Sequence, residues 1–452
     1  MGENFFGRDL MIKLSDRFNY QKLLQFTAPS IGTMAVMSVY GVVDGFFVSN
    51  FVGTLQFASL SFLFPPYMLL IFIGTLFGTG GSALIGKTLG EGKRTKANEI
   101  FSMLIYVSIF IGVVFGIFGI IYVRDVAQFL GAKGELLEYG VSYANILLLA
   151  LPFVILQMQF DSYFSTAEKP QLGFYVTIAA GLTNVVLDAL FIVGFGFGLQ
   201  GAAAATAISE FIGGALPLIY FGRKNSSLLR LTKTYLDLPA LFQTCTNGVS
   251  ELLSSVSMSV VGMLYNWQLL RYAGEDGVAA FAVMMYATML FESIFIGYSM
   301  GVAPVVAYHY GAKNYSELQN LLKKSLTLIA IFAVIMFTCA ETFARPLIDI
   351  FLETKENIFE MAVHGFRILA FAYLLMGFSM FTSGFFTALN NGKLSAVISG
   401  MRTLVFETSA VLILPLIFGL EGIWLSMIGA EIMAVSVSIF LLKANAKRYK
   451  YF

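Results

Sequence analysis

The chain has 452 residues, of which 58% are hydrophobic and 12% are charged, and its formal net charge is +1. Soluble chains are typically about 25% charged, so this composition indicates a membrane protein that crosses the bilayer many times. The small net charge gives no support for nucleic-acid binding. The two cysteines form no disulfide framework or CxxC motif, and the two histidines have no metal-ligand spacing, so no bound metal centre is expected.

In chain order, a charged and weakly apolar segment over residues 1–22 comes first, and it is predicted to lie as an amphipathic segment on the cytoplasmic membrane surface. Twelve apolar runs follow, each long enough for the roughly 20 residues of a transmembrane helix. Their approximate limits are 23–50, 56–86, 100–123, 139–163, 172–195, 199–222, 240–270, 275–310, 318–342, 362–388, 394–418 and 421–443. The sequence therefore predicts an all-α polytopic membrane protein with twelve transmembrane helices.

The longest polar break lies near the middle of the chain, over residues 223–239, and it carries four basic residues. It predicts a cytoplasmic linker between an amino-terminal lobe, 23–222, and a carboxyl-terminal lobe, 240–443, with a cytoplasmic tail at 444–452. Each lobe holds six runs, so the two pseudo-symmetric bundles are expected to enter the membrane in the same direction. Most of the 28 lysines and arginines fall on the side of the amino terminus, which predicts both termini in the cytoplasm, with the protein in the cell inner membrane.

Two stretches repeat one layout at half the chain length, residues 181–210 and residues 400–431. With a small slip between helices, Asp188 aligns with Glu407 and Glu210 aligns with Glu431. Repetition at this period is typical of transporters that are built from two related halves.

Several acidic and amide side chains of the amino-terminal half lie within apolar runs that are predicted to span the membrane. Asn184 and Asp188 are four residues apart in one apolar run, as are Thr206 and Glu210 in the next, so each pair shares a helix face. Asp44 lies late in the first run, and no lysine lies deep in the first six runs. A carboxyl group at membrane depth is costly and indicates function. Without a basic partner, such acids must be protonated, hydrated or bound to a cation.

Further candidates are less specific. Gln157, Gln159 and Asp161 lie on the fourth run; for Asp161 and Glu210, water-exposed helix ends or interhelical hydrogen bonds are the alternative interpretation. In the second half Glu251 and Glu292 look deepest, although Arg367 and Arg402 offer ion pairs there. Aromatic and methionine side chains are abundant, and those facing a cleft, with Tyr265 as one candidate, would suit flat hydrophobic cations.

Together these features resemble the multidrug and toxic compound extrusion (MATE) family, bacterial type. The resemblance rests on Asp44 in VVDGFFVSNFVG, on Asn184-x-x-x-Asp188, on GLQGAAAATAIS with Thr206, and on the turn 311–314 after the eighth run. It implies export of organic cations or drugs in exchange for protons or sodium, by alternating inward-open and outward-open states. It also implies a coupling site at Asp44 and Asp188 with Asn184 and Thr206 as neighbours, where the coupling ion, a proton or sodium, would bind, and no other cofactor.

Two positions depart from the family pattern. Some members place an acid on the tenth helix as the partner of the seventh-helix glutamate, whereas this chain has Arg367 and Tyr373 and no acid there, so Glu251 lacks that partner. A fourth-helix asparagine of some sodium sites has no clear match, and Gln157 or Gln159 stands near it. Both protons and sodium therefore stay open as coupling ions.

Three other classes of function fit this sequence less well. A lipid-linked saccharide flippase of the same superfamily needs a strongly cationic cavity for pyrophosphate, whereas the deep residues here are mostly acidic. An enzyme is not expected, because HExxH and GxSxG motifs are missing from the sequence. A non-transporting receptor or scaffold would not need repeated buried acids. The expected partners are small cationic amphipathic substrates and the lipid bilayer, and two lobes in one chain are expected to function as a monomer.

Overall fold

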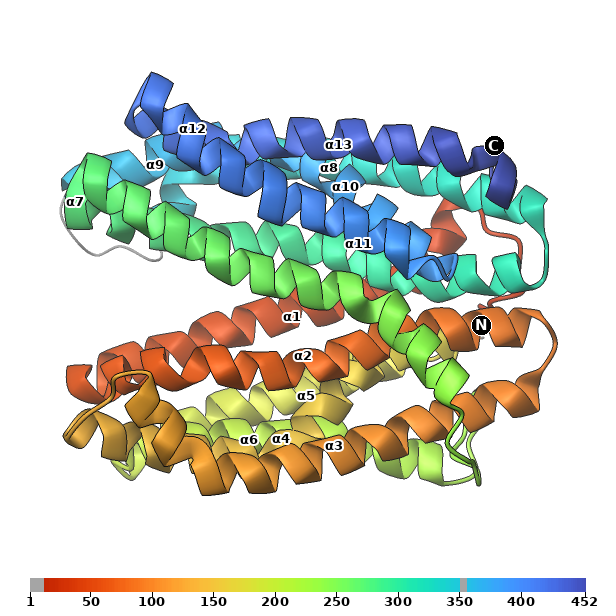
Figure 1. Ribbon diagram of the computed structural model, residues 1–452, viewed down its shortest axis with the longest axis horizontal. Helices are drawn as coiled ribbons and strands as arrows, with labels where there is room; N and C mark the ends of the chain where they lie inside the picture. The colour runs from red at the N-terminus through yellow and green to blue at the C-terminus, as the bar shows by residue number, and fades with distance from the viewer. Residues whose placement is uncertain (1–11, 350–355) are drawn as a thin grey trace, which may run out of the picture.

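The computed structural model describes residues 12–349 and 356–452, and over these residues it is helical with no strands. Two bundles lie side by side, α1 to α6 in one and most of α7 to α13 in the other (Figure 1). The predicted all-α membrane fold is confirmed.

The amino-terminal lobe consists of long apolar helices with short connections. Their bounds are α1 Tyr20–Phe51, α2 Thr54–Gly90, α3 Arg94–Phe129, α4 Glu135–Thr166, α5 Pro170–Asp188 with a π-helical extension η1 Ala189–Gly194, and α6 Gly198–Gly222. Local chemistry sets where they start: the Asn19 side chain accepts a hydrogen bond from the backbone N–H of Lys22 (2.8 Å) and caps α1, while Pro170 occupies the first turn of α5.

The carboxyl-terminal lobe begins with α7, in which two helices are joined at Gly274. The bounds are α7 Leu238–Gly311, α8 Tyr315–Asp349, α9 Glu356–Ala370, α10 Tyr373–Ala388, α11 Gly392–Gly400, π-helical η2 Met401–Glu407, α12 Thr408–Phe418 and α13 Leu420–Tyr449. Asp237 caps α7 by accepting the N–H of Ala240 (3.1 Å), and Asn391 caps α11 by accepting the N–H of Leu394 (3.3 Å).

Each of the twelve predicted runs falls on these helices, but several of the runs differ in detail from the helices that contain them. In the described residues ten helices are long and apolar enough to cross a membrane, or eleven if α9 and α10, bent by 54°, count as one span. The stretch α7 covers two predicted runs, and its backbone leaves the helical conformation at Gly274, so it consists of two helices joined at that residue, one for each run. The run at 394–418 contains the π-helical turn η2.

The predicted linker runs in extended form along the start of α3. Arg94 donates to the carbonyl of Ser227 (2.9 Å), and the N–H of Arg230 donates to the side chain of Asn98 (2.8 Å). We call this part of the molecule the linker end; it includes residues 223–237 and the carboxyl terminus lies there too (Figure 1).

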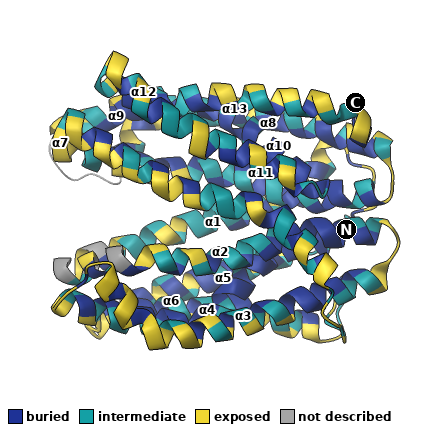
Figure 2. Ribbon diagram, in the orientation of Figure 1, coloured by how far each residue is buried: buried dark blue, intermediate teal, exposed yellow. Residues whose placement is uncertain are grey.

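The two lobes touch mainly at the linker end. A Cβ atom on Gly248 of α7 would lie 2.1 Å from the carbonyl oxygen of Leu76, and one on Gly80 of α2 would lie 2.1 Å from the carbonyl oxygen of Thr244, so the two backbones are in direct contact. Further along α7, a Cβ on Gly262 would meet nothing within 4 Å. Buried residues gather inside each lobe and where the lobes meet (Figure 2). The structure is therefore closed at the linker end.

Gly248→Leu should open the linker end. The leucine side chain cannot fit against the backbone of α2, so the lobes must separate there, and we expect the thiol of Cys245, one turn away, to react at least several-fold faster with a maleimide. The measurement uses a Cys339→Ala background, since Cys245 and Cys339 are the two cysteines of the chain. Gly262→Leu on the same helix is the matched control. Unchanged labelling in Gly248→Leu would show that the contact does not hold the lobes together.

Residues 12–19 join both lobes at the linker end, and residues 1–11 of the predicted amphipathic segment lie outside the described residues. Residues 12–19 form a turn and extended chain rather than a helix. The N–H of Leu14 donates to Glu168 (2.6 Å) in the turn between α4 and α5, and the N–H of Phe18 donates to Glu317 (2.8 Å) of α8. We call residues 12–19 the amino-terminal strap.

Candidate functional site

Asp188 lies where the regular part of α5 ends. It is 0% exposed, Asn184 one turn earlier is 1% exposed, and the π-helical turn η1 begins at the next residue. A π-helical turn widens the helix by one residue and is frequently found at functional sites. The break therefore sits beside the acid that the sequence analysis singled out.

The four predicted coupling residues lie together between α1, α5 and α6. The carboxyl group of Asp44 on α1 interacts with that of Asp188. Across the next interface, the amide of Asn184 donates to the hydroxyl of Thr206 on α6 (3.5 Å). Glu210 follows Thr206 by one turn, and its electrostatic interaction with Asp44 places it in the same group. Three helices thus gather three acids, an amide and a hydroxyl at one place.

Several oxygen atoms in this group can accept a hydrogen bond but have no hydrogen-bond donor beside them. Both side-chain oxygens of Asp188, and one each of Asp44, Asn184 and Glu210, are buried with no hydrogen-bond partner in the described structure. No ion pair recorded for the described residues involves these acids. Ionised carboxylates only accept hydrogen bonds, so facing carboxylates need a proton or a cation between them. A site whose ligand atoms are all oxygens suits either a proton or sodium, and it would bind a soft metal ion poorly.

A central cavity of about 320 Å³ lies between the lobes, with walls from α1, α2, α4, α7, α10, α11 and η2. Its charged lining residues are Asp161, Glu251, Glu292 and Arg402. Methionines supply much of the remaining wall: Met34, Met37, Met158, Met258, Met300 and Met380. The cavity is thus acidic and lined with flexible thioethers, which adapt to ligands of differing shape.

The remaining predicted residues lie elsewhere. Gln157 is buried against α6, where a Cβ on Gly213 would lie 2.1 Å from its Oε1, and Gln159 donates to the hydroxyl of Tyr163 (3.1 Å). Tyr265 is 3% exposed and stacks on Phe281 at 4.7 Å inside the carboxyl-terminal lobe. None of the three lines the cavity as described, so the structure places them in helix packing.

The sequence analysis missed the polar stripe of α2 that faces the cavity. Thr75, Thr79 and Ser82 all line it. They are four and three residues apart, a spacing that places side chains on one face of a helix, so this polar face could have been predicted from the sequence. Hydroxyl groups on this wall offer hydrogen bonds to a bound molecule without adding charge.

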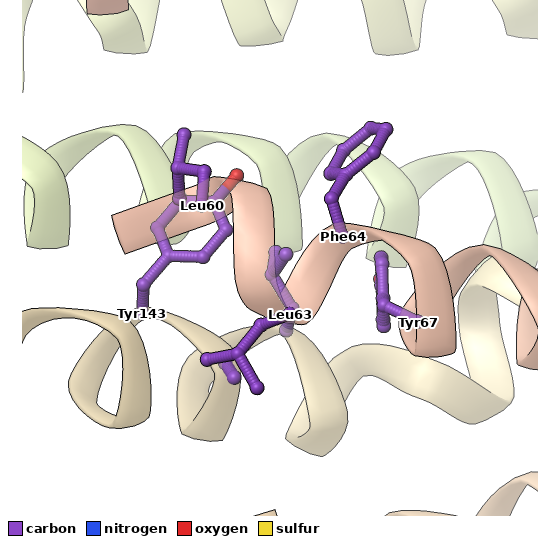
Figure 3. Close-up of a pocket in the computed structure, with 7 residues that line it drawn as sticks. Leu60, Leu63, Phe64, Tyr67 and Tyr143 are labelled. Carbon is purple, nitrogen blue, oxygen red and sulfur yellow. The ribbon is translucent and has the colours of Figure 1, made fainter. Parts of the chain in front are cut away.

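A second, smaller hollow lies within the amino-terminal lobe between α2 and α4. Figure 3 shows Leu60, Leu63, Phe64 and Tyr67 of α2 with Tyr143 of α4 around it. Its volume is about 10 Å³, which is about the size of a single water molecule. It is a packing gap and offers no room for a substrate.

Comparison with known proteins gives a consistent family assignment. The sequence pattern of the MatE family matches residues 29–190 and 251–412, once in each lobe. The multidrug export protein MepA of Staphylococcus haemolyticus (strain JCSC1435) is 26% identical over 430 residues, covering 95% of this chain and 94% of the relative. MepA of Staphylococcus aureus (strain MRSA252) is 26% identical over 432 residues, covering 94% of both chains.

Solved structures share the fold. A crystal structure of a MATE protein in complex with MaL6 superposes with a TM-score of 0.93 at 22% identity, covering 98% of this chain and 100% of the other. An outward-facing multidrug resistance MATE transporter gives a TM-score of 0.91 at 23% identity and covers 98% of each chain. The family pattern covers more than half of this sequence and repeats as the two lobes do. The chain therefore belongs to the MatE family of membrane transporters and is not an enzyme.

Proposed function

We propose that this protein is a secondary active antiporter that exports organic cations or drugs in exchange for protons or sodium. The observation that carries the proposal is the pair Asp44 and Asp188, which face each other inside the amino-terminal lobe with no basic partner among the described residues. The multidrug export function named for relatives at 26% identity supports the same class of activity.

Ion binding at this pair changes how the first lobe packs. A proton or sodium ion neutralises the repulsion between Asp44 on α1 and Asp188 on α5, so α1 packs closely against α5 and α6. Release of the ion restores the repulsion and favours a different packing of α1. Because substrate and ion each prefer one packing, the ion gradient shifts the population between states that open to opposite sides.

The central cavity supports a cationic cargo. Asp161 faces it from the first lobe, and Glu251 and Glu292 face it from the second. Arg402, the one basic side chain on its described wall, is held by Glu431 at 2.5 Å and so contributes little positive field. The lipid-linked saccharide flippase, which would need a cationic wall for pyrophosphate, is not favoured.

The orientation in the membrane follows from charge. The linker end carries most of the basic residues, so we place it, and with it both termini, in the cytoplasm. In bacteria this corresponds to the cytoplasmic membrane. One chain contains both lobes and the whole cavity, so a monomer is sufficient for transport.

The function is tested by uptake of a fluorescent dye cation into sealed vesicles that contain the purified protein. A pH gradient and a sodium gradient are imposed separately. We expect one of the two imposed ion gradients to drive the dye from lower to higher dye concentration. The gradient that does so would identify the coupling ion. Transport under neither gradient would contradict the antiporter and make a labelled lipid-linked saccharide the next substrate to test.

Glu251→Gln should weaken recognition of a cationic dye. Glu251 lines the cavity, and no ion pair is recorded for it in the described structure; loss of its charge should raise the apparent KM by about tenfold, equivalent to about 1.4 kcal/mol, with a smaller change in maximal rate. Glu275→Gln, an exposed acid on the same helix, is the matched control. An unchanged KM would mean that the dye does not bind near this wall.

A further inference from the structure

The carboxyl-terminal lobe contains a second group of three acids, one of which, Glu292, also lines the central cavity. Glu292 comes from α7, Glu407 ends the π-helical turn η2, and Glu431 lies on α13. In the sequence repeat, Glu407 and Glu431 correspond to Asp188 and Glu210 of the first lobe. Each lobe therefore gathers three acids, two of them at equivalent positions of the repeat.

The second group differs because a cation is built into it. Nε of Arg402 donates to Oε1 of Glu431 at 2.5 Å, and the hydroxyl of Ser379 donates to Oε2 of Glu431 at 2.8 Å. The side chains of Arg402 and Glu431 are 16% and 3% exposed. The charges of Glu292 and Glu407 also act on the guanidinium. Arg402 is therefore paired directly with Glu431 and lies within the electrostatic reach of Glu292 and Glu407.

The backbone explains how an arginine reaches this place. Arg402 is the second residue of η2, and the offset of the repeat aligns it with Thr183 of α5. Thr183 lies before the π-helical turn of its own lobe, and its hydroxyl donates back to the carbonyl of Ala179 at 2.7 Å. The π-helical turn in the second lobe includes the arginine itself and changes the direction of its side chain. The two lobes thus use the same kind of break to present different residues.

We propose that Arg402 is a tethered cation that fills, in the carboxyl-terminal lobe, the site equivalent to the one that binds the coupling ion in the amino-terminal lobe. The comparison with the first lobe rests on the proposed function. A monovalent cation or a proton is the chemical class of ligand that this site takes when the arginine is absent. While Arg402 is present, the second lobe titrates no ion and only the first lobe is coupled.

Charged and titratable groups reach this site from four sides. Glu292 and Tyr265 face it from α7, Glu407 from η2, Glu431 from α13, and Tyr373 of α10 lies beside Glu292. Arg402 is the one basic group recorded in this set. Its removal leaves carboxylates that only a proton or an added cation can neutralise.

The test compares Arg402→Met with Arg402→Lys in the full-length protein, both in an Asp188→Asn background that removes the first-lobe acid pair. The midpoint of thermal unfolding, Tm, is measured in detergent from pH 5 to pH 8, with and without sodium. We expect Arg402→Met to gain a saturable rise of about 2 to 5 °C with sodium or with acid. Arg402→Lys keeps a tethered charge and should show no such gain.

Adding Glu431→Gln to Arg402→Met should abolish the new response. If Arg402→Met folds poorly, rescue of its yield by sodium or acid supports the proposal, whereas equal Tm profiles for the methionine and lysine variants overturn it. The proposal is also overturned if Glu431→Gln restores the folding of Arg402→Met while neither sodium nor pH has any effect. Arg402 and Glu431 would then form an ordinary structural ion pair. The transport assay with Asp188→Asn alone tests the first-lobe function separately, so the two proposals fail in different experiments.

Discussion

Asp188→Asn should reduce gradient-driven dye transport to the level of protein-free vesicles. The amide has nearly the same size as the carboxyl group, but it carries no charge that a proton or sodium ion could neutralise. The ion gradient then has no differential effect on the two packings of α1, and coupling is lost. Dye binding should change little, because Asp188 does not line the central cavity as described.

The controls separate loss of coupling from loss of folding. Asp125→Asn replaces an exposed acid near the end of α3 and should transport normally. Binding of the dye to purified Asp188→Asn, measured by fluorescence polarisation, should remain within a few-fold of the unchanged protein. Full coupled transport by Asp188→Asn would show that the acid pair is not the coupling site. Loss of dye binding together with transport would indicate a folding defect instead.

Local spacing explains why part of this site could be predicted from the sequence. Asn184 and Asp188, like Thr206 and Glu210, are four residues apart, and the helical period alone places each pair on one face. The approach of Asp44 to Asp188 joins residues 144 positions apart, and no periodicity could show it. The pairing of Asp44 with Asp188 was predicted only from the resemblance to the MATE family.

Other features could not be read from the sequence because their cause lies in tertiary packing. Gln157, Gln159 and Asp161 lie close together in the sequence, yet successive residues of a helix point about 100° apart, and only Asp161 of the three lines the cavity. The bend between α9 and α10 occurs with no proline in residues 356–388. The π-helical turns η1 and η2 likewise have no compositional signal, although both adjoin the aligned acids Asp188 and Glu407.

Phe18→Ala should release the amino-terminal strap from the linker end. The ring is 1% exposed and lies edge-on to Phe26 with the centroids 5.9 Å apart. Its backbone is held as well, since the N–H donates to Glu317, and the carbonyl accepts from Asn320 (2.8 Å) and Lys324 (3.0 Å). Truncation of a buried phenylalanine typically costs about 3 to 5 kcal/mol, so we expect a lower Tm and much faster hydrogen exchange over residues 12–19.

The matched control is the neighbouring Arg17, whose side chain is 91% exposed and lies 3.9 Å from Glu317. Exposed ion pairs contribute about 0 to 1 kcal/mol, so Arg17→Ala should leave both Tm and exchange nearly unchanged. Equal exchange in Phe18→Ala and Arg17→Ala would show that the buried ring does not hold the strap in place.

The strap also bears on transport, because it is tied to both lobes. Leu14 is held by Glu168 of the first lobe and Phe18 by Glu317 of the second, so separation of the lobes at the linker end must break at least one of these two hydrogen bonds. Phe18→Ala should therefore favour the state that opens at the linker end, and labelling of Cys245 should rise as in Gly248→Leu. The two variants act on different contacts, α2 against α7 in one and the strap in the other. Faster exchange of the strap without any change at Cys245 would mean that the strap follows the lobes and does not restrain them.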